Sequence, residues 1–299
     1  MPRAAGVNVW VAGARPRTLP AAVVPVAVGT ACAVGEAHGG LIWWRAVAAL
    51  VVAVAIQVAT NYANDYSDGI RGTDTDEHRV GPVRLVGQGL AAPPAVKRAA
   101  LCAFGVAAVA GLALTVAIGP VLLVVGAASF AAGWFYTGGS RPYGYAGFGE
   151  VFVFAFFGLV ATVGSTYVQT ERLTGLSWAA AVPVGLLATA LLVVNNLRDI
   201  PGDTQAGKRT LAVRLGDART RALYTTLIVA TFVAVPFVCG LGGRPVGAVC
   251  LLALLLAQRP VLAVLQGAAG GDLVPVLGAT GRVQLVFGLL LAAGIAISG

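Results

Sequence analysis

The chain has 299 residues, of which 58% are hydrophobic and only 11% are charged, and its mean hydropathy is +0.85. Soluble globular proteins carry about 25% charged residues, so this composition excludes a soluble enzyme and a nucleic-acid-binding domain. We therefore expect one polytopic membrane domain over residues 1–299, in contact with membrane lipid.

Apolar segments long enough to cross a bilayer recur along the whole length of the chain. They predict nine transmembrane helices, at residues 19–35, 43–62, 98–118, 120–136, 151–167, 178–194, 223–240, 246–265 and 282–298. A very short turn at Gly119–Pro120 joins the third to the fourth. We expect an all-α bundle around a central cavity that opens toward the cytoplasm.

The Lys and Arg residues are distributed unevenly over the predicted loops. Nine spans place alternate loops on opposite sides, and one side then receives only Arg45, Arg172 and Arg244, while the other receives every remaining Lys and Arg. Cytoplasmic loops of membrane proteins carry an excess of these residues. We therefore interpret the net charge of +8 as a topology signal and assign the rich side to the cytoplasm.

Two polar, acidic stretches stand out against this apolar background. Residues 61–84, NYANDYSDGIRGTDTDEHRVGPVR, follow the second span, and residues 194–210, VNNLRDIPGDTQAGKRT, follow the sixth, so both lie on the cytoplasmic side. In each stretch the key residues recur every three or four positions and share one helical face: Asn61, Asn64, Asp65 and Asp68 in the first, and Asn195, Asp199 and Asp203 in the second.

Carboxylates this close repel one another unless a cation lies between them, and ionisable groups near a bilayer are functional candidates. Their oxygens suit Mg²⁺, which prefers one or two carboxylates together with water and substrate phosphates. The stretches therefore predict a metal-held diphosphate between two facing helices. The alternatives are a solvated acidic loop for the first stretch and a capped helix end, broken at Pro201–Gly202, for the second.

Basic and aromatic residues accompany these stretches. For four of them, phosphate contact and topology charge both remain open: Arg79, Arg84, Arg141 and Lys208. Tyr143 and its neighbouring tyrosines in residues 136–145 either line an aromatic pocket or lie at the membrane interface, where tyrosine is common.

These residues resemble the UbiA-type intramembrane prenyltransferase superfamily. The NDxxD motif of that family matches residues 64–68, NDYSD, and its DxxxD motif matches residues 199–203, DIPGD. The longer segments ARPRTLPAAVVPVAVGTA, NDYSDGIRGTD, RVGPVRLV, YTGGSRPYGY and VNNLRDIPGDTQAGKRTLAVRLG resemble the branch that prenylates 1,4-dihydroxy-2-naphthoate. The hydroxybenzoate branch carries a further Asp where this chain has Gly72, which favours the naphthoate branch.

The resemblance implies Mg²⁺-dependent transfer of a polyprenyl group from polyprenyl diphosphate to 1,4-dihydroxy-2-naphthoate with loss of CO₂, in a bacterial plasma membrane. It implies catalytic roles for Asp65, Asp68, Asp199 and Asp203. The implied metal ligands are Asn64, Asp68, Asp199 and Asp203, with Asp65 supporting or replacing one of them. Lys208, Arg79, Arg84 and Arg141 would bind the diphosphate, and Arg17 and Tyr143 the acceptor, although topology charge explains Arg17 equally well.

Two rival functions remain open at this point. A cation-coupled transporter also binds ions through acidic side chains, but it predicts charges deep within broken helices. Here the acids gather at helix ends beside basic, Gly-rich loops, which favours phosphate chemistry. The second rival is a prenyltransferase of the same superfamily with another acceptor.

Overall fold

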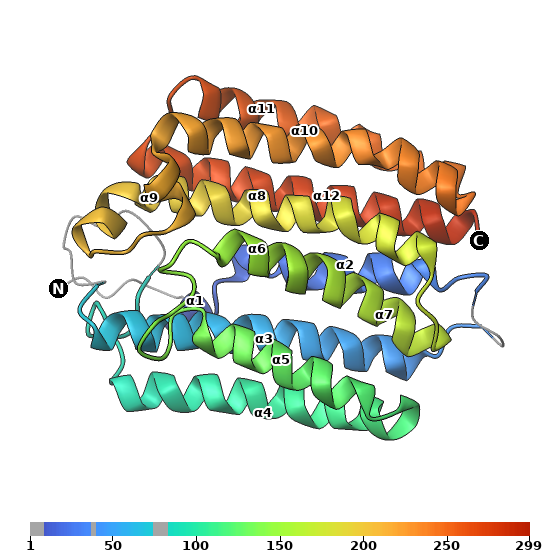
Figure 1. Cartoon of the computed structure of the whole chain (residues 1–299), viewed down its shortest axis with the longest axis horizontal. Coiled ribbons are helices and arrows are strands. Elements are labelled where there is room, and N and C mark those ends of the chain that lie inside the picture. The colour runs from blue at the N-terminus through green and yellow to red at the C-terminus, as the bar shows by residue number, and fades with distance from the viewer. Residues whose placement is uncertain (1–8, 37–39, 74–82) are drawn as a thin grey trace.

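The computed structural model describes residues 9–36, 40–73 and 83–299, and within these ranges all regular elements are helices. Figure 1 shows long helices lying roughly side by side, with the connections after α3 and α8 at one end of the bundle and the C-terminus at the opposite end. This arrangement is an all-α membrane fold.

In the part of the chain that the structure describes, seven helices are long and apolar enough to cross a membrane. Five are continuous α-helices: α3 (Trp43–Ile70), α4 (Pro93–Ile118), α8 (Gly175–Gln205), α10 (Asp217–Gly242) and α12 (Leu273–Ile297). Two are composite: α6 (Gly149–Val153) continues through the π-helical η2 (Phe154–Val160) into α7 (Ala161–Thr170), and the 3₁₀-helix η3 (Pro245–Ala253) continues into α11 (Leu254–Leu265).

The remaining helices of the described chain are shorter. Two are apolar and occupy the first and fourth predicted spans: α2 (Pro20–Cys32) and α5 (Val121–Phe135). The others are connections, namely α1 (Val9–Ala14), η1 (Pro16–Thr18), α9 (Leu211–Leu215) and η4 (Gly270–Asp272). Each predicted span therefore has a helix, but seven meet the length of a membrane span, and the count of nine stays a prediction.

Three predicted helix ends differ most from the structure. The helices α3 and α8 continue into the two acidic stretches, as far as Ile70 and Gln205, because polar residues end a hydropathy signal without ending the backbone hydrogen bonds of a helix. Pro201 lies inside α8 and does not break it. The last helix begins at Leu273 and not at Arg282, so Arg282 lies within α12.

The apolar core lies around α8, which packs against α10, α12, α2 and the α6–α7 helix. Two glycines allow α2 to fit between its neighbours. A Cβ atom added to Gly288 of α12 would lie 2.2 Å from Val24, and one added to Gly29 of α2 would lie 2.1 Å from the carbonyl oxygen of Thr162 in α7. On the other side of the bundle, α3 packs against α4 and α5.

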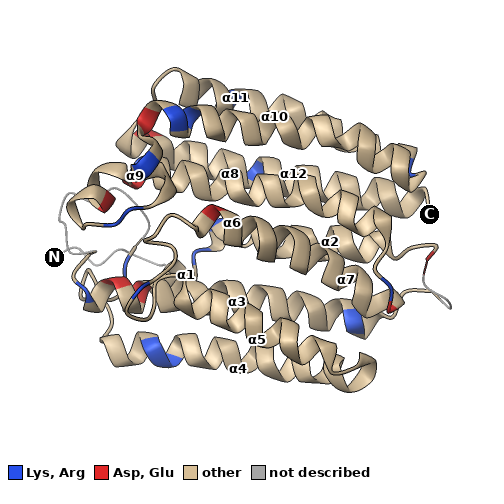
Figure 2. Cartoon of the chain, in the orientation of Figure 1, with Lys and Arg blue, Asp and Glu red and all other residues tan. Residues whose placement is uncertain are grey.

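Most charged residues lie at the end of the bundle that carries the acidic stretches (Figure 2). At the opposite end, Arg45 pairs with Glu171 at 3.2 Å and Arg244 donates a hydrogen bond to the carbonyl oxygen of Val34 at 2.8 Å. The position of Arg45 and Arg244 at this end agrees with the predicted asymmetry.

Candidate active site

A cavity of about 750 Å³ lies between α3 and α8. Its deeper walls are apolar and come from α3, α4, α5 and the α6–α7 helix. At the charged end, both acidic helices contribute to its lining: Asn61, Asn64 and Asp68 from α3, and Asn195, Asp199 and Asp203 from α8. The structure thus brings residues separated by more than 100 positions in sequence to the wall of one cavity.

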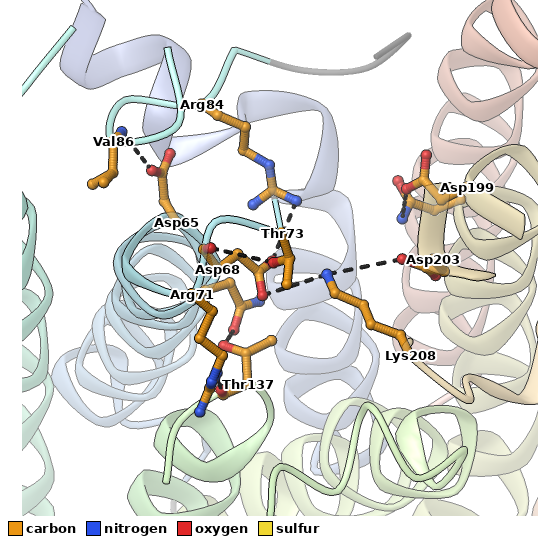
Figure 3. A network of polar contacts seen from close by, with 12 residues as sticks. Asp65, Asp68, Arg71, Thr73, Arg84, Val86, Thr137, Asp199, Asp203 and Lys208 are labelled. Atoms are coloured by element: carbon orange, nitrogen blue, oxygen red, sulfur yellow. Dashed lines mark hydrogen bonds and ion pairs between the residues drawn. The ribbon is translucent and has the colours of Figure 1, made fainter. Parts of the chain in front are cut away.

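Asp68 lies at the centre of the polar network in Figure 3. Its side chain is 4% exposed, and two cations approach it: Arg84 Nη2 lies 3.7 Å from Oδ2, and Lys208 Nζ lies 3.5 Å from Oδ1. The Tyr145 hydroxyl donates a hydrogen bond to Oδ1. A carboxylate this buried needs such partners, because an uncompensated charge would be costly there.

Lys208 connects the two acidic helices. Its Nζ lies 3.8 Å from Oδ1 of Asp203, as well as 3.5 Å from Asp68, and its side chain is 8% exposed. The ammonium group also lies 4.7 Å from the centre of the Tyr145 ring. The backbone fixes this position, since Lys208 N–H donates to the Asp203 carbonyl oxygen and Arg209 N–H donates to that of Tyr145.

Asp199 is held by its own helix. Arg198 donates two hydrogen bonds to its carboxylate, at 2.8 and 2.7 Å, and Asn195 Nδ2 approaches it at 3.4 Å. Arg198 is buried and also donates to Asn195 Oδ1 at 3.0 Å. The bidentate contact between Arg198 and Asp199 fixes the orientation of this carboxylate on the cavity wall.

Asp65 is placed differently from its neighbour Asp68. Its carboxylate is fully buried and accepts hydrogen bonds from the backbone N–H groups of Leu85 and Val86, at 2.8 and 2.9 Å. It is not among the residues that line the cavity. Figure 3 shows it directed away from Asp203 and Lys208, toward the segment that carries Arg84.

Asn64 and the loop after α5 meet at the same end of the cavity. Thr137 Oγ1 donates a hydrogen bond to Asn64 Oδ1 at 2.8 Å, and Arg71 donates to the carbonyl oxygens of Thr137 and Gly139. These contacts dock the loop at residues 136–148 onto α3. Burial and the neighbouring Asp68 carboxylate raise the pKa of Tyr145 in this loop, so its hydroxyl remains a hydrogen-bond donor.

The remaining predicted site residues occupy different environments. Arg84 and Tyr143 line the cavity, and the Tyr143 ring stacks on Phe152 at 4.0 Å. Arg17 is exposed at the start of α2 and lines the cavity as well. Arg141 is exposed and does not line it, so its diphosphate role stays a prediction without a supporting contact. Arg79 lies outside the described residues.

Sequence reasoning missed several residues of this site. The loop pattern assigns Arg198 only to the basic cytoplasmic side, although its position next to Asp199 is a signal for the ion pair that the structure shows. Arg15 lines the cavity from the turn before α2, with a left-handed backbone φ of 54° that no sequence pattern indicates. The roles of Thr137 and Tyr145 depend on how one loop folds onto α3.

The donor set fits a divalent cation bound together with a diphosphate. Among the described residues, no group of three or more His, Cys, Asp or Glu side chains forms a preassembled metal site. Asp68 and Asp203 are nevertheless close enough for one ammonium group to reach both. Because Mg²⁺ takes few protein carboxylates and completes its shell with water and phosphate oxygens, Asn64, Asp68, Asp199 and Asp203 suit it.

Comparison with protein families and curated sequences gives concordant results. The model of the UbiA prenyltransferase family matches residues 22–272. The chain is 51% identical over 291 residues to the 1,4-dihydroxy-2-naphthoate octaprenyltransferase of Mycobacterium leprae, covering 97% of both chains. It is 52% identical over 287 residues to the enzyme of the same name from Mycobacterium tuberculosis, covering 96% of both.

Solved structures show the same fold at low sequence identity. A UbiA homologue from Archaeoglobus fulgidus bound to DMAPP and Mg²⁺ matches with a TM-score of 0.58 and 14% identity, covering 96% of this chain and 99% of that one. Another structure of a UbiA homologue from this organism matches with a TM-score of 0.63 and 16% identity, covering 97% and 100%.

Proposed function

Because the chain belongs to the UbiA prenyltransferase family, we propose that it transfers a polyprenyl group from polyprenyl diphosphate to 1,4-dihydroxy-2-naphthoate. The reaction is Mg²⁺-dependent, releases pyrophosphate and CO₂, and gives demethylmenaquinol. The relatives that support this acceptor are about half identical to the chain over nearly their whole length. The observation that carries the proposal is the cavity that joins the acidic helices α3 and α8 above an apolar chamber.

In the proposed site, Asn64, Asp68, Asp199 and Asp203 hold the metal. A bound divalent cation supplies charge neutralisation for the departing pyrophosphate. Lys208 and Arg84 lie beside the same carboxylates, so they are placed to bind the phosphate oxygens as charge builds on them. Asp65 supports the site by holding the segment of Arg84.

The apolar part of the cavity holds the prenyl chain and the aromatic acceptor. The rings of Tyr143 and Phe152 lie on its wall, where their faces favour positive charge that develops on the allylic carbon. As the bond from that carbon to the diphosphate oxygen breaks, the electron-rich ring of the acceptor bonds to it. Loss of the carboxylate as CO₂ then restores aromaticity. Arg17 is our proposed contact for that carboxylate before it leaves.

We place the protein in the plasma membrane of a bacterium, since the named relatives at about 50% identity are bacterial. The charged end of the bundle faces the cytoplasm in this proposal, because that end carries most of the Lys and Arg residues.

The test is prenyl transfer by the purified protein in detergent, with polyprenyl diphosphate, the naphthoate, and either Mg²⁺ or EDTA, and with the product identified by mass. We expect a prenylated, decarboxylated product only with Mg²⁺. Asp68→Ala and Asp199→Ala should each lower the rate by about 100-fold or more, because loss of a metal ligand removes several kcal/mol of charge stabilisation.

Asp217→Ala provides the matched control, since Asp217 lies on α10 in an exposed ion pair with Arg221 and does not line the cavity. Its rate should equal that of the wild type. Product with a different acceptor and none with the naphthoate would retain the family and reject the acceptor. No product with any acceptor, from folded protein, would reject the transferase function.

A further inference from the structure

A second hollow, of about 390 Å³, lies beside the main cavity. It is lined by Arg17, from η1 before α2, and by four residues of α12: Val274, Pro275, Gly278 and Arg282. Arg17 and Val274 line the main cavity as well. The two spaces therefore share a wall, and the smaller one lies at the side of the reaction chamber.

The helix geometry explains why these residues converge. Val274, Gly278 and Arg282 are spaced four residues apart, so they share one face of α12. Gly281 contacts the Arg17 backbone, since a Cβ atom at Gly281 would lie 3.3 Å from the Arg17 carbonyl oxygen. Arg282 therefore lies at the level of Arg17.

Both arginines are exposed, and neither forms an ion pair or hydrogen bond with a described residue. The lining contains no carboxylate. Arg282 lies within α12, and its side chain is exposed at this hollow. Two guanidinium groups beside an apolar and glycine-lined wall are suited to a flat anion, which accepts paired hydrogen bonds from them.

We propose that Arg17 and Arg282 form a docking site for the carboxylate of the aromatic acceptor, at a side entrance to the reaction cavity. This inference rests on the function proposed above and identifies the acceptor-binding residues. The volume is within the range of small-molecule sites. The shared Arg17 would keep contact with the carboxylate as the ring moves past Val274 into the main cavity.

The test is equilibrium binding to the full-length protein in phosphatidylcholine nanodiscs, without prenyl diphosphate or Mg²⁺. The probe is 1-hydroxy-2-naphthoate, a fluorescent analogue of the acceptor that is not readily oxidised to a quinone. Arg282→Gln and Arg17→Gln should each weaken binding by about 10-fold or more, because each removes a charge-assisted hydrogen bond. The same two variants should bind 1-naphthol, which lacks the carboxylate, with an affinity within about 2-fold of the wild type. Arg282→Lys keeps the positive charge and should retain part of the affinity for the acid.

Arg259→Gln is the matched control, since Arg259 is also an exposed arginine inside an apolar helix, α11, and lines neither hollow. It should bind the acid as the wild type does. If Arg282→Gln does not fold, Gly278→Val tests the same site. A Cβ atom at Gly278 meets no atom within 4 Å, so the larger side chain projects into the hollow and should weaken binding of the acid.

Unchanged affinity for the acid in folded Arg282→Gln or Gly278→Val protein would overturn the proposal. A second set of nanodiscs also contains phosphatidylglycerol. If Arg282→Gln loses binding of this lipid but binds the acid as the wild type does, the proposal is overturned and the hollow is assigned to a lipid headgroup. Failure of the proposed function is a separate result, because it is the absence of prenyl transfer by the wild type, whereas this experiment measures binding.

Discussion

Asp65 and Asp68 lie three positions apart on α3, yet their carboxylates have different partners. The Asp65 carboxylate accepts hydrogen bonds from the backbone N–H groups of Leu85 and Val86. The Asp68 carboxylate instead contacts side chains, namely those of Lys208, Arg84 and Tyr145. We interpret Asp65 as a residue that positions the segment carrying Arg84. Asp68 remains available to a ligand in the cavity.

Asp65→Asn should therefore loosen this segment. The amide presents one acceptor oxygen in place of two charged ones, so we expect the free energy of unfolding to fall by about 1–3 kcal/mol. Hydrogen exchange of residues 83–91 should accelerate, and the KM for polyprenyl diphosphate should rise because Arg84 is less well held. Thermal unfolding and exchange mass spectrometry measure these effects, with Asp217→Asn as control. Unchanged exchange together with a rate as low as that of Asp68→Ala would instead indicate a ligand.

At this scale, the sequence predicted which residues face one another but not how they pair. Helical spacing placed Asn64 and Asp68 on one face and Asp199 and Asp203 on another, and all four line the cavity. The contact between Lys208 and Asp68 spans 140 positions and depends on tertiary packing, so no local pattern indicates it. The binding of Asp65 to the backbone was likewise not predictable.

Among the elements, the positions of the helices were readable because long apolar runs leave few alternatives in lipid. Their ends were not, since hydropathy reports where the lipid ends and not where the helix does. Both α3 and α8 continue beyond the apolar part. The apolar run predicts a last helix from Arg282, whereas α12 begins at Leu273, so Arg282 lies inside it.

The contact of α2 with α7 depends on Gly29. A Cβ atom there would lie 2.1 Å from the Thr162 carbonyl oxygen, and Thr166 donates a hydrogen bond to the Gly29 carbonyl oxygen at 2.7 Å. We expect Gly29→Val to lower the free energy of unfolding by about 1–3 kcal/mol, because the backbone of Thr162 cannot easily move away from the added side chain. Thermal unfolding in detergent checks this.

Gly240→Val is the matched control for that experiment, since Gly240 also lies within a long helix, α10, and a Cβ atom there meets nothing within 4 Å. If both variants unfold at the wild-type temperature, close packing at Gly29 does not hold α2 in place.

For the molecule as a whole, the apolar chamber should limit the length of the prenyl chain. Gly164 of α7 lines it, and no atom lies within 4 Å of a Cβ atom placed there. Gly164→Leu should therefore fold but occupy chamber volume. We expect the rate with a long polyprenyl diphosphate to fall about 10-fold more than the rate with dimethylallyl diphosphate, measured in parallel.

Gly105→Leu is the control for chamber volume, because Gly105 of α4 is exposed, has the same free space and does not line the cavity. Equal losses with the long and the short substrate in Gly164→Leu would show that the chain does not extend past α7.

Mg²⁺ and pyrophosphate together should stabilise the fold more than the sum of either alone, because the proposed site needs phosphate oxygens to complete the metal shell. At about 100 times the dissociation constant, the ligand pair should add about 2.7 kcal/mol to the free energy of unfolding. Thermal unfolding with each component and with both measures this, and Asp68→Ala should abolish the joint effect. Full stabilisation by Mg²⁺ alone would contradict the shared site.

The cavity lies between two groups of helices, and an inhibitor can bind both groups at once. One acidic helix, α3, packs on α4 and α5, whereas the other, α8, packs on α10 and α12. Across the cavity, the ammonium group of Lys208 reaches both helices. A stable mimic of the diphosphate, with oxygen donors for both sides and no allylic carbon to release, would fill the chamber and at the same time fasten two groups of helices together. Such an inhibitor should dissociate slowly, because its departure breaks contacts with both groups of helices at once.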